Sequence, residues 1–218
     1  MSERKLFALI ARRPDLSGAA FSAHWRQVHG PLALRMPALR RYVQNHVRPW
    51  SFRLVEPPAL DGIAEAWFDD AAPEDGTGGL HTDPVYLDGA RRDEPNFMDL
   101  TRHHYLRVDE HVVVPGAAGE VKILLLARRR AGTTAARFEE AWFGSARSAP
   151  GLSRCVRNAV TGWPDGTPRP AYDAVDELWW EDLDALSAAQ DDPPTWELLR
   201  GTEVADTVAV RVDPVRLR

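Results

Sequence analysis

The sequence predicts an α+β protein in which two ferredoxin-like β-α-β-β-α-β units pack sheet to sheet as a barrel within one chain. Three observations lead to this prediction: an internal repeat, the same order of apolar strand and helix patterns in both copies, and a linker of small residues between them. A unit of this topology carries its helices on one sheet face only, so the other face must be covered. Two units in one chain can cover each other.

The repeat is visible in the aligned residues. Residues 5–10 align with residues 122–127 at an offset of 117, and the same offset pairs Trp25 with Trp142. A four-residue deletion then changes the offset to 113 and later to 112, over residues 37–45 and 61–68. Matches that keep their order with such small shifts indicate two copies of one structural unit.

Each unit begins with a strand and an amphipathic helix. In the first unit the apolar run 5–11 predicts the strand, and Ser17 is placed to cap the helix that follows. An apolar stripe at helical spacing continues through Phe21, Trp25, Val28 and Leu32. Pro37 ends this helix.

The rest of the first unit supplies three strands and a short helix. The strands are predicted over residues 41–47, 62–68 and 111–114, and the helix over residues 84–92. Residues 69–83 are rich in glycine, proline and aspartate, which is typical of a loop.

The second unit repeats this order from a strand at residues 121–127 to a strand at residues 207–212. Residues 115–119 contain two glycines and two alanines and link the units, so the predicted domains are residues 1–116 and 117–218. The first is expected to carry the active site and the second to be a degenerate copy. A first unit alone would expose an apolar sheet face and should aggregate or dimerise.

Composition excludes several classes of protein. The formal net charge of −5 argues against a sequence-independent nucleic-acid binder. No apolar run approaches the roughly 18 residues of a membrane span. Arg12 and Arg13 interrupt the N-terminal apolar stretch, so no signal peptide is expected. The single cysteine, Cys155, cannot form an internal disulfide, which favours a cytoplasmic protein.

Several segments of the first unit resemble a known family. The first-helix signature of the EthD-like family, in the dimeric α+β barrel superfamily, is similar to the pattern Phe21-x-x-His24-Trp25-x-x-x-His29-Gly30-Pro31-Leu32. Later family segments resemble residues 41–46, 61–68 and 96–99. Family members carry one unit and dimerise, so the resemblance implies an intrachain dimeric α+β barrel. His24 departs from the family, which has an aromatic residue such as tyrosine at that position.

The resemblance implies a cavity for a hydrophobic aromatic or polyketide-like molecule. Related barrels include cofactor-free monooxygenases, polyketide cyclases and haem-dependent peroxidases, so the fold fixes a cavity and not a reaction. One hypothesis is a cofactor-free enzyme that uses histidine and tyrosine acid–base chemistry for decarboxylation, dehydration, cyclisation or oxygenation. The other is a binder or accessory protein for an apolar metabolite in an oxidative degradation pathway. We expect a monomer with an internal pseudo-dimer or a homodimer, without nucleic-acid or membrane partners.

The repeat also predicts which strand face carries the site. Residues 43, 45 and 47 are valine, asparagine and valine, as at the matching positions of the second copy, so this face is assigned to helix packing. Tyr42, Gln44 and His46 then face the barrel cavity. Their counterparts in the second copy are Cys155, Arg157 and Ala159. The first unit therefore keeps a titratable set that the second lacks.

The catalytic candidates are His29, Tyr42, His46 and Glu65. His29 is at the end of the amphipathic helix, where a neutral imidazole can exchange protons near pH 7. The alternative for His29 is a structural one, with the ring packed on Trp25 and favoured by the helix dipole.

The other three catalytic candidates also have structural alternatives. Tyr42 and His46 are about 13 Å apart on one strand face, so they can flank a substrate. The structural alternative is that Tyr42 packs in the core and His46 lies at the end of the strand. Glu65 is an orienting partner for the site, or it forms a structural ion pair with Arg41 or Arg154, since a buried carboxylate needs a partner.

The substrate-binding candidates have side chains that can pack on an aromatic ligand or form a hydrogen bond with it. They are His24, Trp25, Gln44, Trp67 and Trp179. His24 and His29 are about 140° apart around an α-helix, so they are not expected to chelate a metal together. The sequence lacks a phosphate-binding loop, a dinucleotide-binding glycine pattern and a nucleophile elbow. Neither a metal nor another cofactor is predicted.

Overall fold

The computed structural model describes residues 3–50, 60–69, 83–145, 149–163, 170–192 and 203–218. The strands are β1 (Glu3–Ile10), β2 (Leu39–Val47), β3 (Gly62–Asp69), β4 (His104–Val114), β5 (Val121–Arg129), β6 (Leu152–Gly162), β7 (Ala174–Trp180) and β8 (Val204–Arg216). The helices are α1 (Gly18–His24), η1 (Trp25–His29), α2 (Gly30–Ala33), α3 (Pro84–Asp88), α4 (Ala90–Asp93), η2 (Glu94–Asn96), α5 (Ala135–Ser145) and α6 (Leu183–Gln190). The predicted strands and helices are present, with two differences: β4 begins at His104, seven residues before the strand predicted at 111–114, and the helix predicted over 84–92 is divided into α3 and α4. Most of the loop predicted over 69–83 lies outside the described residues.

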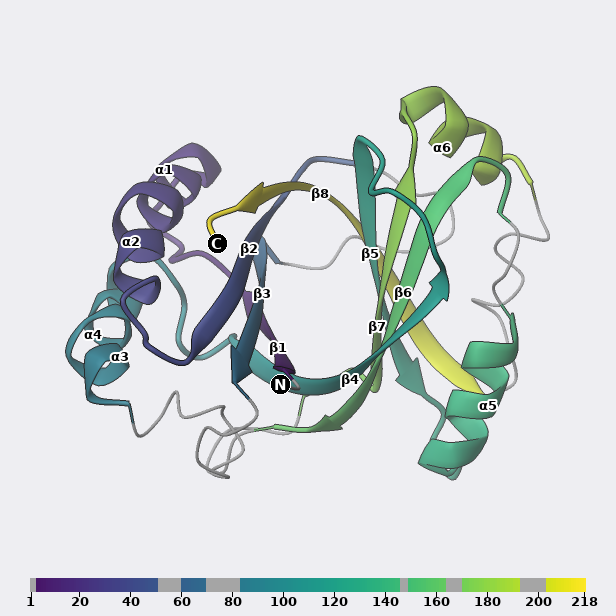
Figure 1. Ribbon diagram of the computed structural model, residues 1–218, viewed down its shortest axis with the longest axis horizontal. Helices are drawn as coiled ribbons and strands as arrows, with labels where there is room; N and C mark the ends of the chain where they lie inside the picture. Colours follow the sequence, from purple (N-terminus) through teal and green to yellow (C-terminus); the bar gives the residue numbers. More distant parts are fainter. Residues whose placement is uncertain (1–2, 51–59, 70–82, 146–148, 164–169, 193–202) are drawn as a thin grey trace.

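The eight described strands form one closed antiparallel barrel (Figure 1). Their order around the barrel is β1-β3-β2-β8-β5-β7-β6-β4, and pairing of β4 with β1 closes it. The helices lie outside, with α1 to α4 against one side of the barrel and α5 and α6 against the other. The predicted barrel within one chain is therefore confirmed. In the described part of the chain, no helix combines the length and apolar character needed to cross a bilayer.

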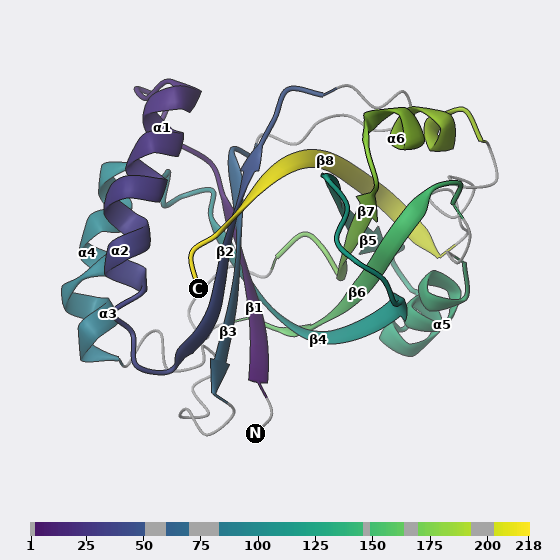
Figure 2. The same ribbon diagram turned by 45° about the horizontal axis from the view of Figure 1, so that its top comes forward.

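Two strands join the halves of the chain. β4 pairs with β1 and with β6, and β8 pairs with β5 and with β2. Figure 2 shows the end of β8 running beside β2, and the Leu217 N–H beyond it donates to the Tyr42 carbonyl at 3.0 Å. Leu217 also packs on the apolar cluster beneath the first-half helices. The C-terminal segment thus contributes to the wall that those helices cover.

Side chains fill the barrel interior. Its apolar layer consists of Phe7, Leu9, Ile63, Leu106, Val108, Leu124, Leu126, Val175, Val208, Val210 and Val212. An interior packed with such residues excludes a ligand. The prediction of a cavity inside the barrel is therefore wrong, because the two halves contribute core residues to the space between their sheets.

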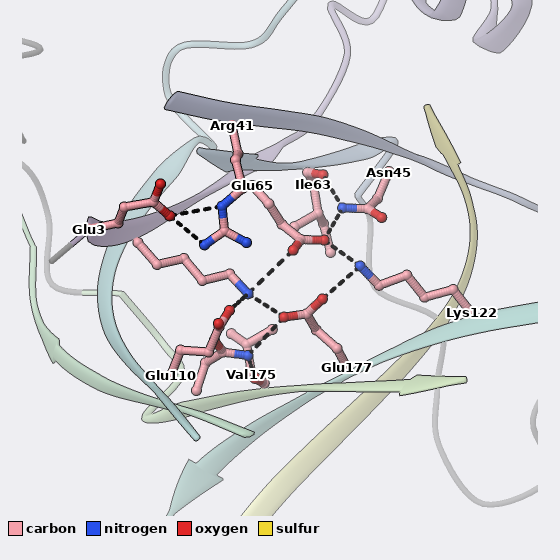
Figure 3. A network of polar contacts seen from close by, with 11 residues as sticks. Glu3, Arg41, Asn45, Ile63, Glu65, Glu110, Lys122, Val175 and Glu177 are labelled. Atoms are coloured by element: carbon pink, nitrogen blue, oxygen red, sulfur yellow. Dashed lines mark hydrogen bonds and ion pairs between the residues drawn. The ribbon is translucent and has the colours of Figure 1, made fainter. Parts of the chain in front are cut away.

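A layer of buried charges lies in the same interior (Figure 3). Lys5 forms ion pairs with Glu177 and with Glu110, the latter at 2.7 Å, and lies 3.3 Å from Glu65. Lys122 pairs with Glu65 and, at 2.8 Å, with Glu177. Because Lys5 and Glu65 come from the first half and Lys122 and Glu177 from the second, these ion pairs hold the two halves together.

Gly62 allows Trp25 to pack directly on the barrel wall. A Cβ at this position would overlap the indole ring of Trp25, which is fully buried. We expect Gly62→Ala to lower the free energy of unfolding by about 1–3 kcal/mol, because the tryptophan must shift within a packed core. Gly18→Ala is the control, since a Cβ there meets no atom within 4 Å. Urea denaturation measures both, and equal effects would contradict this packing.

Candidate active site

A cavity of about 60 Å³ lies between the first-half helices and the outer face of the barrel. Its apolar lining consists of Leu6, Ala8, Ile10, Ala33, Met36, Ala64, Ala66, Phe68, Ala90, Phe97 and Met98. The titratable side chains that line it are His29, Tyr42, Tyr86, Glu94 and Tyr105. A mostly apolar pocket with a few convergent polar groups is the usual form of a small-molecule site.

Small side chains on the barrel wall create this cavity. They are Ala8 on β1 and Ala64 and Ala66 on β3. At the positions that the repeat makes equivalent, the second half has Leu125, Asp176 and Leu178, all of them buried. Asp176 there forms a buried ion pair with Arg157 at 3.2 Å. The second half therefore fills the space that the first half leaves open.

A π-helical turn shapes the helix above the cavity. In this turn, η1, the Gly30 N–H donates to the Trp25 carbonyl, five residues back, in place of the four-residue spacing of an α-helix. Gln44 Nε2 donates to the same carbonyl at 2.8 Å. The next residue, Pro31, has no N–H and cannot continue the regular pattern of hydrogen bonds. The sequence therefore favours an irregular turn at this position.

The π turn brings His24 and His29 to one carboxylate. His24 Nε2 lies 2.9 Å from Asp93 Oδ1, and His29 Nδ1 lies 3.2 Å from Asp93 Oδ2. The separation of about 140° predicted for an α-helix is wrong here, because residues five apart meet on the same side of a π turn. Both rings also pack on Phe97, with centroid distances of 5.4 Å for His24 and 4.7 Å for His29.

Asp93 fixes the orientation of His29. Burial raises the pKa of Asp93, but hydrogen bonds from His29, Asn96 and His24 together outweigh burial and hold this pKa below its ordinary value. Asp93 is therefore ionised near neutral pH and accepts a hydrogen bond from His29 Nδ1–H. In a neutral imidazole, this tautomer leaves the lone pair on Nε2. A histidine in this state has the chemistry needed to accept a proton.

Glu94, next to Asp93 in the chain, anchors a second polar group. Its Oε1 accepts hydrogen bonds from the Tyr86 hydroxyl and, at 3.1 Å, from the Tyr105 hydroxyl. Its Oε2 pairs with Arg91. Burial raises the pKa of Tyr86 and of Tyr105, so both hydroxyls keep their protons near neutral pH. The cavity thus has one end formed by an oriented histidine and another formed by a carboxylate with two phenol groups.

Tyr42 joins His29 at the cavity, from strand β2. Burial raises its pKa to about 12, so its hydroxyl remains a hydrogen-bond donor at neutral pH. Of the four catalytic candidates from the sequence, the structure brings these two to the same cavity.

The predicted faces of β2 are reversed. Gln44 and His46 both face the helices and not the barrel interior. Gln44 donates to a helix carbonyl, and His46 Nδ1 lies 2.5 Å from Ser22 Oγ. Asn45 faces the barrel interior, where its Nδ2 donates to Glu65 at 2.7 Å, and Val47 packs against the interior cluster. The Val-Asn-Val face is common to both halves because both halves line one interior, not because both pack helices.

His46, Trp25 and Gln44 pack between the helix and the barrel without lining the cavity. The His46 ring lies 4.7 Å from the Trp25 ring. Burial, followed by the charges of Arg48 and Arg26, lowers the pKa of His46 to about 4, so this histidine is neutral at physiological pH. These contacts support a positioning role for Trp25, which belongs to η1, and for Gln44 and His46 beneath it.

Glu65, Trp67 and Trp179 lie away from the cavity, with the charged layer of the barrel interior. Burial and then the neighbouring Glu177 raise the pKa of Glu65. The expected ion pair with Arg41 or Arg154 is wrong, because Glu65 pairs with the two interior lysines, and Arg41 binds Glu3 at 2.6 Å. Trp67 and Trp179 each cover one of these lysines, with 4.6 Å from Nζ to the ring centroid.

Four residues near the cavity were not predicted from the sequence: Asp93, Glu94, Tyr86 and Tyr105. Three of them lie on or beside the short helix predicted at residues 84–92, and Tyr105 lies on β4. The sequence does contain one signal for them, the adjacent acidic residues Asp93 and Glu94 that follow two arginines. If such a pair is buried, each carboxylate requires a partner. Among the described residues, no set of three or more His, Cys, Asp or Glu side chains could hold a metal ion.

Comparison with known proteins finds a domain match that covers part of the cavity lining but not Leu6, Ala8, Ile10 or Tyr105. Residues 13–101 match the model of the EthD domain. A search of curated protein sequences finds no match to this chain.

Solved structures resemble the whole chain in fold. An anthrone oxidase-like protein matches with a TM-score of 0.67 and 8% identity, over 98% of this chain and 91% of that one. A suspected monooxygenase from Lactobacillus acidophilus NCFM matches with a TM-score of 0.56 and 13% identity, over 99% and 94%. Another, from Fusobacterium nucleatum, matches with a TM-score of 0.56 and 7% identity, over 97% and 91%. At these identities the likeness shows the fold alone.

Proposed function

We propose that this chain, whose residues 13–101 belong to the EthD domain family, is a cofactor-free enzyme for a hydrophobic aromatic or polyketide-like small molecule. The observation that supports this proposal is an oriented histidine at the wall of a mostly apolar cavity. The similar fold of a protein named anthrone oxidase-like supports an aromatic substrate. The proposed reaction is a decarboxylation, dehydration, cyclisation or oxygenation.

His29 is the proposed general base. Its Nε2 takes a proton from an acidic O–H or C–H bond of the substrate, and the electron pair of that bond stays on the substrate. The carboxylate of Asp93 stabilises the imidazolium that forms, through the Nδ1–H hydrogen bond. The imidazolium then returns the proton to the product or to a leaving group. Asp93 is a positioning residue in this scheme, and His24 helps to hold its carboxylate.

Tyr42 is the proposed hydrogen-bond donor to a substrate oxygen. Its raised pKa keeps the hydroxyl protonated while negative charge develops on the substrate. His46 and Glu65, the other two candidates, take positioning and structural roles in this proposal, since neither lines the cavity.

Filling the cavity tests the proposed location of the site. We expect Ala66→Leu to abolish binding of a ligand found by thermal-shift screening, because the larger side chain occupies the space from the barrel wall. The second half has Leu178 at the equivalent position, so this environment is compatible with the fold. Ala19→Leu, at an exposed position of α1, is the control and should bind the ligand normally. Unchanged binding to Ala66→Leu would place the site elsewhere.

The absence of a cofactor is part of the proposal and has its own test. Absorption spectra and metal analysis of the purified protein should show no stoichiometric flavin, haem or metal. A non-enzymatic binder is the alternative function, since it would use the same cavity. In that case His29→Ala would weaken binding while any turnover of the ligand persisted.

We also propose that the chain consists of two ferredoxin-like units, residues 1–116 and 117–218. The strand and helix order is the same in both, and the charged layer repeats as matching lysine–glutamate pairs. Because β2 pairs with β8 of the other unit, the fragment 1–116 should aggregate or dimerise in sedimentation experiments. A monomeric, folded fragment would contradict this division.

A further inference from the structure

The chain beyond β8 lies between two segments that carry candidate site residues. Figures 1 and 2 both show it between strand β2 and the first-half helices. The Tyr42 N–H donates to the Arg218 carbonyl at 3.2 Å, and the Tyr42 carbonyl accepts from the Leu217 N–H at 3.0 Å. The Arg218 guanidinium donates to the Leu39 carbonyl, also at 3.0 Å. The second half of the chain therefore binds the backbone of β2 at Tyr42.

The Leu217 side chain packs on the helix segment that carries His29. A Cβ added to Gly30, the residue after His29, would lie 2.7 Å from Leu217 Cδ1, which is closer than packed carbon atoms approach. Leu217 is half-buried against the apolar cluster beneath the helices. Alanine stabilises a helix more than glycine does, so helix propensity does not explain the glycine at this position. The close contact with Leu217 does.

Gly30 also closes the π turn on which the orientation of His29 depends. Its N–H donates to the Trp25 carbonyl. A change of this turn to α-helical spacing would move Gly30 and rotate His29 relative to His24, because residues five apart meet on one side of a π turn and not of an α-helix. Asp93 could then no longer bind both rings. A contact that fixes Gly30 therefore opposes this change.

We infer that Leu217 is a positioning residue for the proposed site: it holds the π turn that carries His29 against the strand that carries Tyr42. The second half of the chain then completes a site whose polar groups all belong to the first half. Leu217 does not itself line the cavity, so it acts through Gly30. The inference rests on the proposed function for the roles of His29 and Tyr42.

A double-mutant cycle tests the contact between Leu217 and Gly30. Gly30→Ala places a methyl group against the leucine and should therefore lower the urea midpoint of unfolding. Leu217→Ala removes the obstructing carbon, and the next atom, Gln44 Nε2 at 3.2 Å from the added Cβ, need give way by only a few tenths of an ångström. Gly30→Ala should therefore destabilise the Leu217→Ala protein less than it destabilises the wild type. Equal effects, or a Gly30→Ala variant more stable than the wild type, would overturn the contact.

Proton NMR of the ligand-free protein tests the positioning of His29. The His29 ring lies 4.7 Å from the Phe97 ring, whose ring current makes the His29 Cε1–H signal sensitive to its position. Leu217→Ala should shift or broaden this signal, which is identified by its absence from His29→Asn. The Gly30 N–H should exchange with deuterium about tenfold faster or more, because the π turn opens more often. Leu217→Met, of similar volume, should restore both properties.

Leu16→Ala is the control for a general loss of stability. Leu16 is also a half-buried leucine packed on the same cluster, but it precedes α1. This variant should leave the His29 signal and the exchange of the Gly30 N–H unchanged. An unchanged Leu217→Ala protein, or the same changes in both alanine variants, would overturn the inference. Because no ligand is present, these results are independent of turnover, and the proposed function would fail separately, through unchanged turnover in His29→Ala.

Discussion

Asp93→Asn is expected to lower kcat by about 10²–10⁴-fold for a substrate identified by screening, close to the effect of His29→Asn. The amide cannot hold the imidazolium by charge, and its NH₂ group can face Nδ1 and reverse the tautomer, which removes the lone pair from Nε2. Steady-state kinetics measure the effect.

Asp88→Asn is the matched control, because Asp88 is an exposed carboxylate on the neighbouring helix α3. It should leave kcat unchanged. If Asp93→Asn keeps full activity, His29 does not depend on this contact and the proposed base is wrong.

The Asp93 contact also predicts a pH dependence of stability. Because the folded pKa is lower than the unfolded value of about 3.9, the carboxylate stabilises the fold above that pH. The contribution is lost as the pH falls through the folded pKa. Urea denaturation should therefore show a difference between wild type and Asp93→Asn at pH 6 that shrinks as the pH is lowered below 4.

Lys122→Met is expected to lower the free energy of unfolding by about 3–5 kcal/mol, because it removes one of the two cations that neutralise the buried carboxylates. Glu65 and Glu177 would then share Lys5 with Glu110, which gives three carboxylates for one ammonium group. Urea denaturation at pH 7 measures the loss. Adding Glu65→Gln to Lys122→Met removes one unpaired charge, so the double variant should be more stable than Lys122→Met alone.

Arg40→Met is the control for this prediction. Arg40 pairs with Asp69 at the surface, where solvent screens both charges, so its loss should have a much smaller effect. Equal losses from Arg40→Met and Lys122→Met, or a double variant less stable than the single one, would contradict the role of the interior ion pairs.

The sequence predicted the elements and the barrel because both follow from local patterns. Strand and helix periods in the two copies agree with each other, and the repeat supplies the partner that covers each sheet. The same repeat misled the assignment of faces. It identifies which side of β2 is common to both halves, but it does not say what lies on that side, and Asn45 and Asn158 turned out to hold interior glutamates.

The candidate site was only partly predictable. His29 and Tyr42 could be named because they differ from the second half or match a family pattern, and both line the cavity. Asp93 could not be paired with His29 from spacing, because they are 64 residues apart and meet through a π turn. The alanines that form the cavity could not be recognised from the sequence alone, because alanine is common in strands. Their effect becomes visible only when the structure shows larger buried residues at the equivalent positions of the second half.

The pairing of β8 with β2 has a consequence for how the protein is made. The Arg218 guanidinium donates to the Leu39 carbonyl across 179 positions of the chain, and Lys5 meets Glu177 across 172. During synthesis on the ribosome, β2 and the cavity helices emerge long before the strand that completes their sheet. Folding of such a chain is limited by the search for distant contacts and not by the formation of its short helices. The nascent first half therefore keeps an open strand edge in solution until β8 has been synthesised, and this interval is when the protein is most exposed to aggregation.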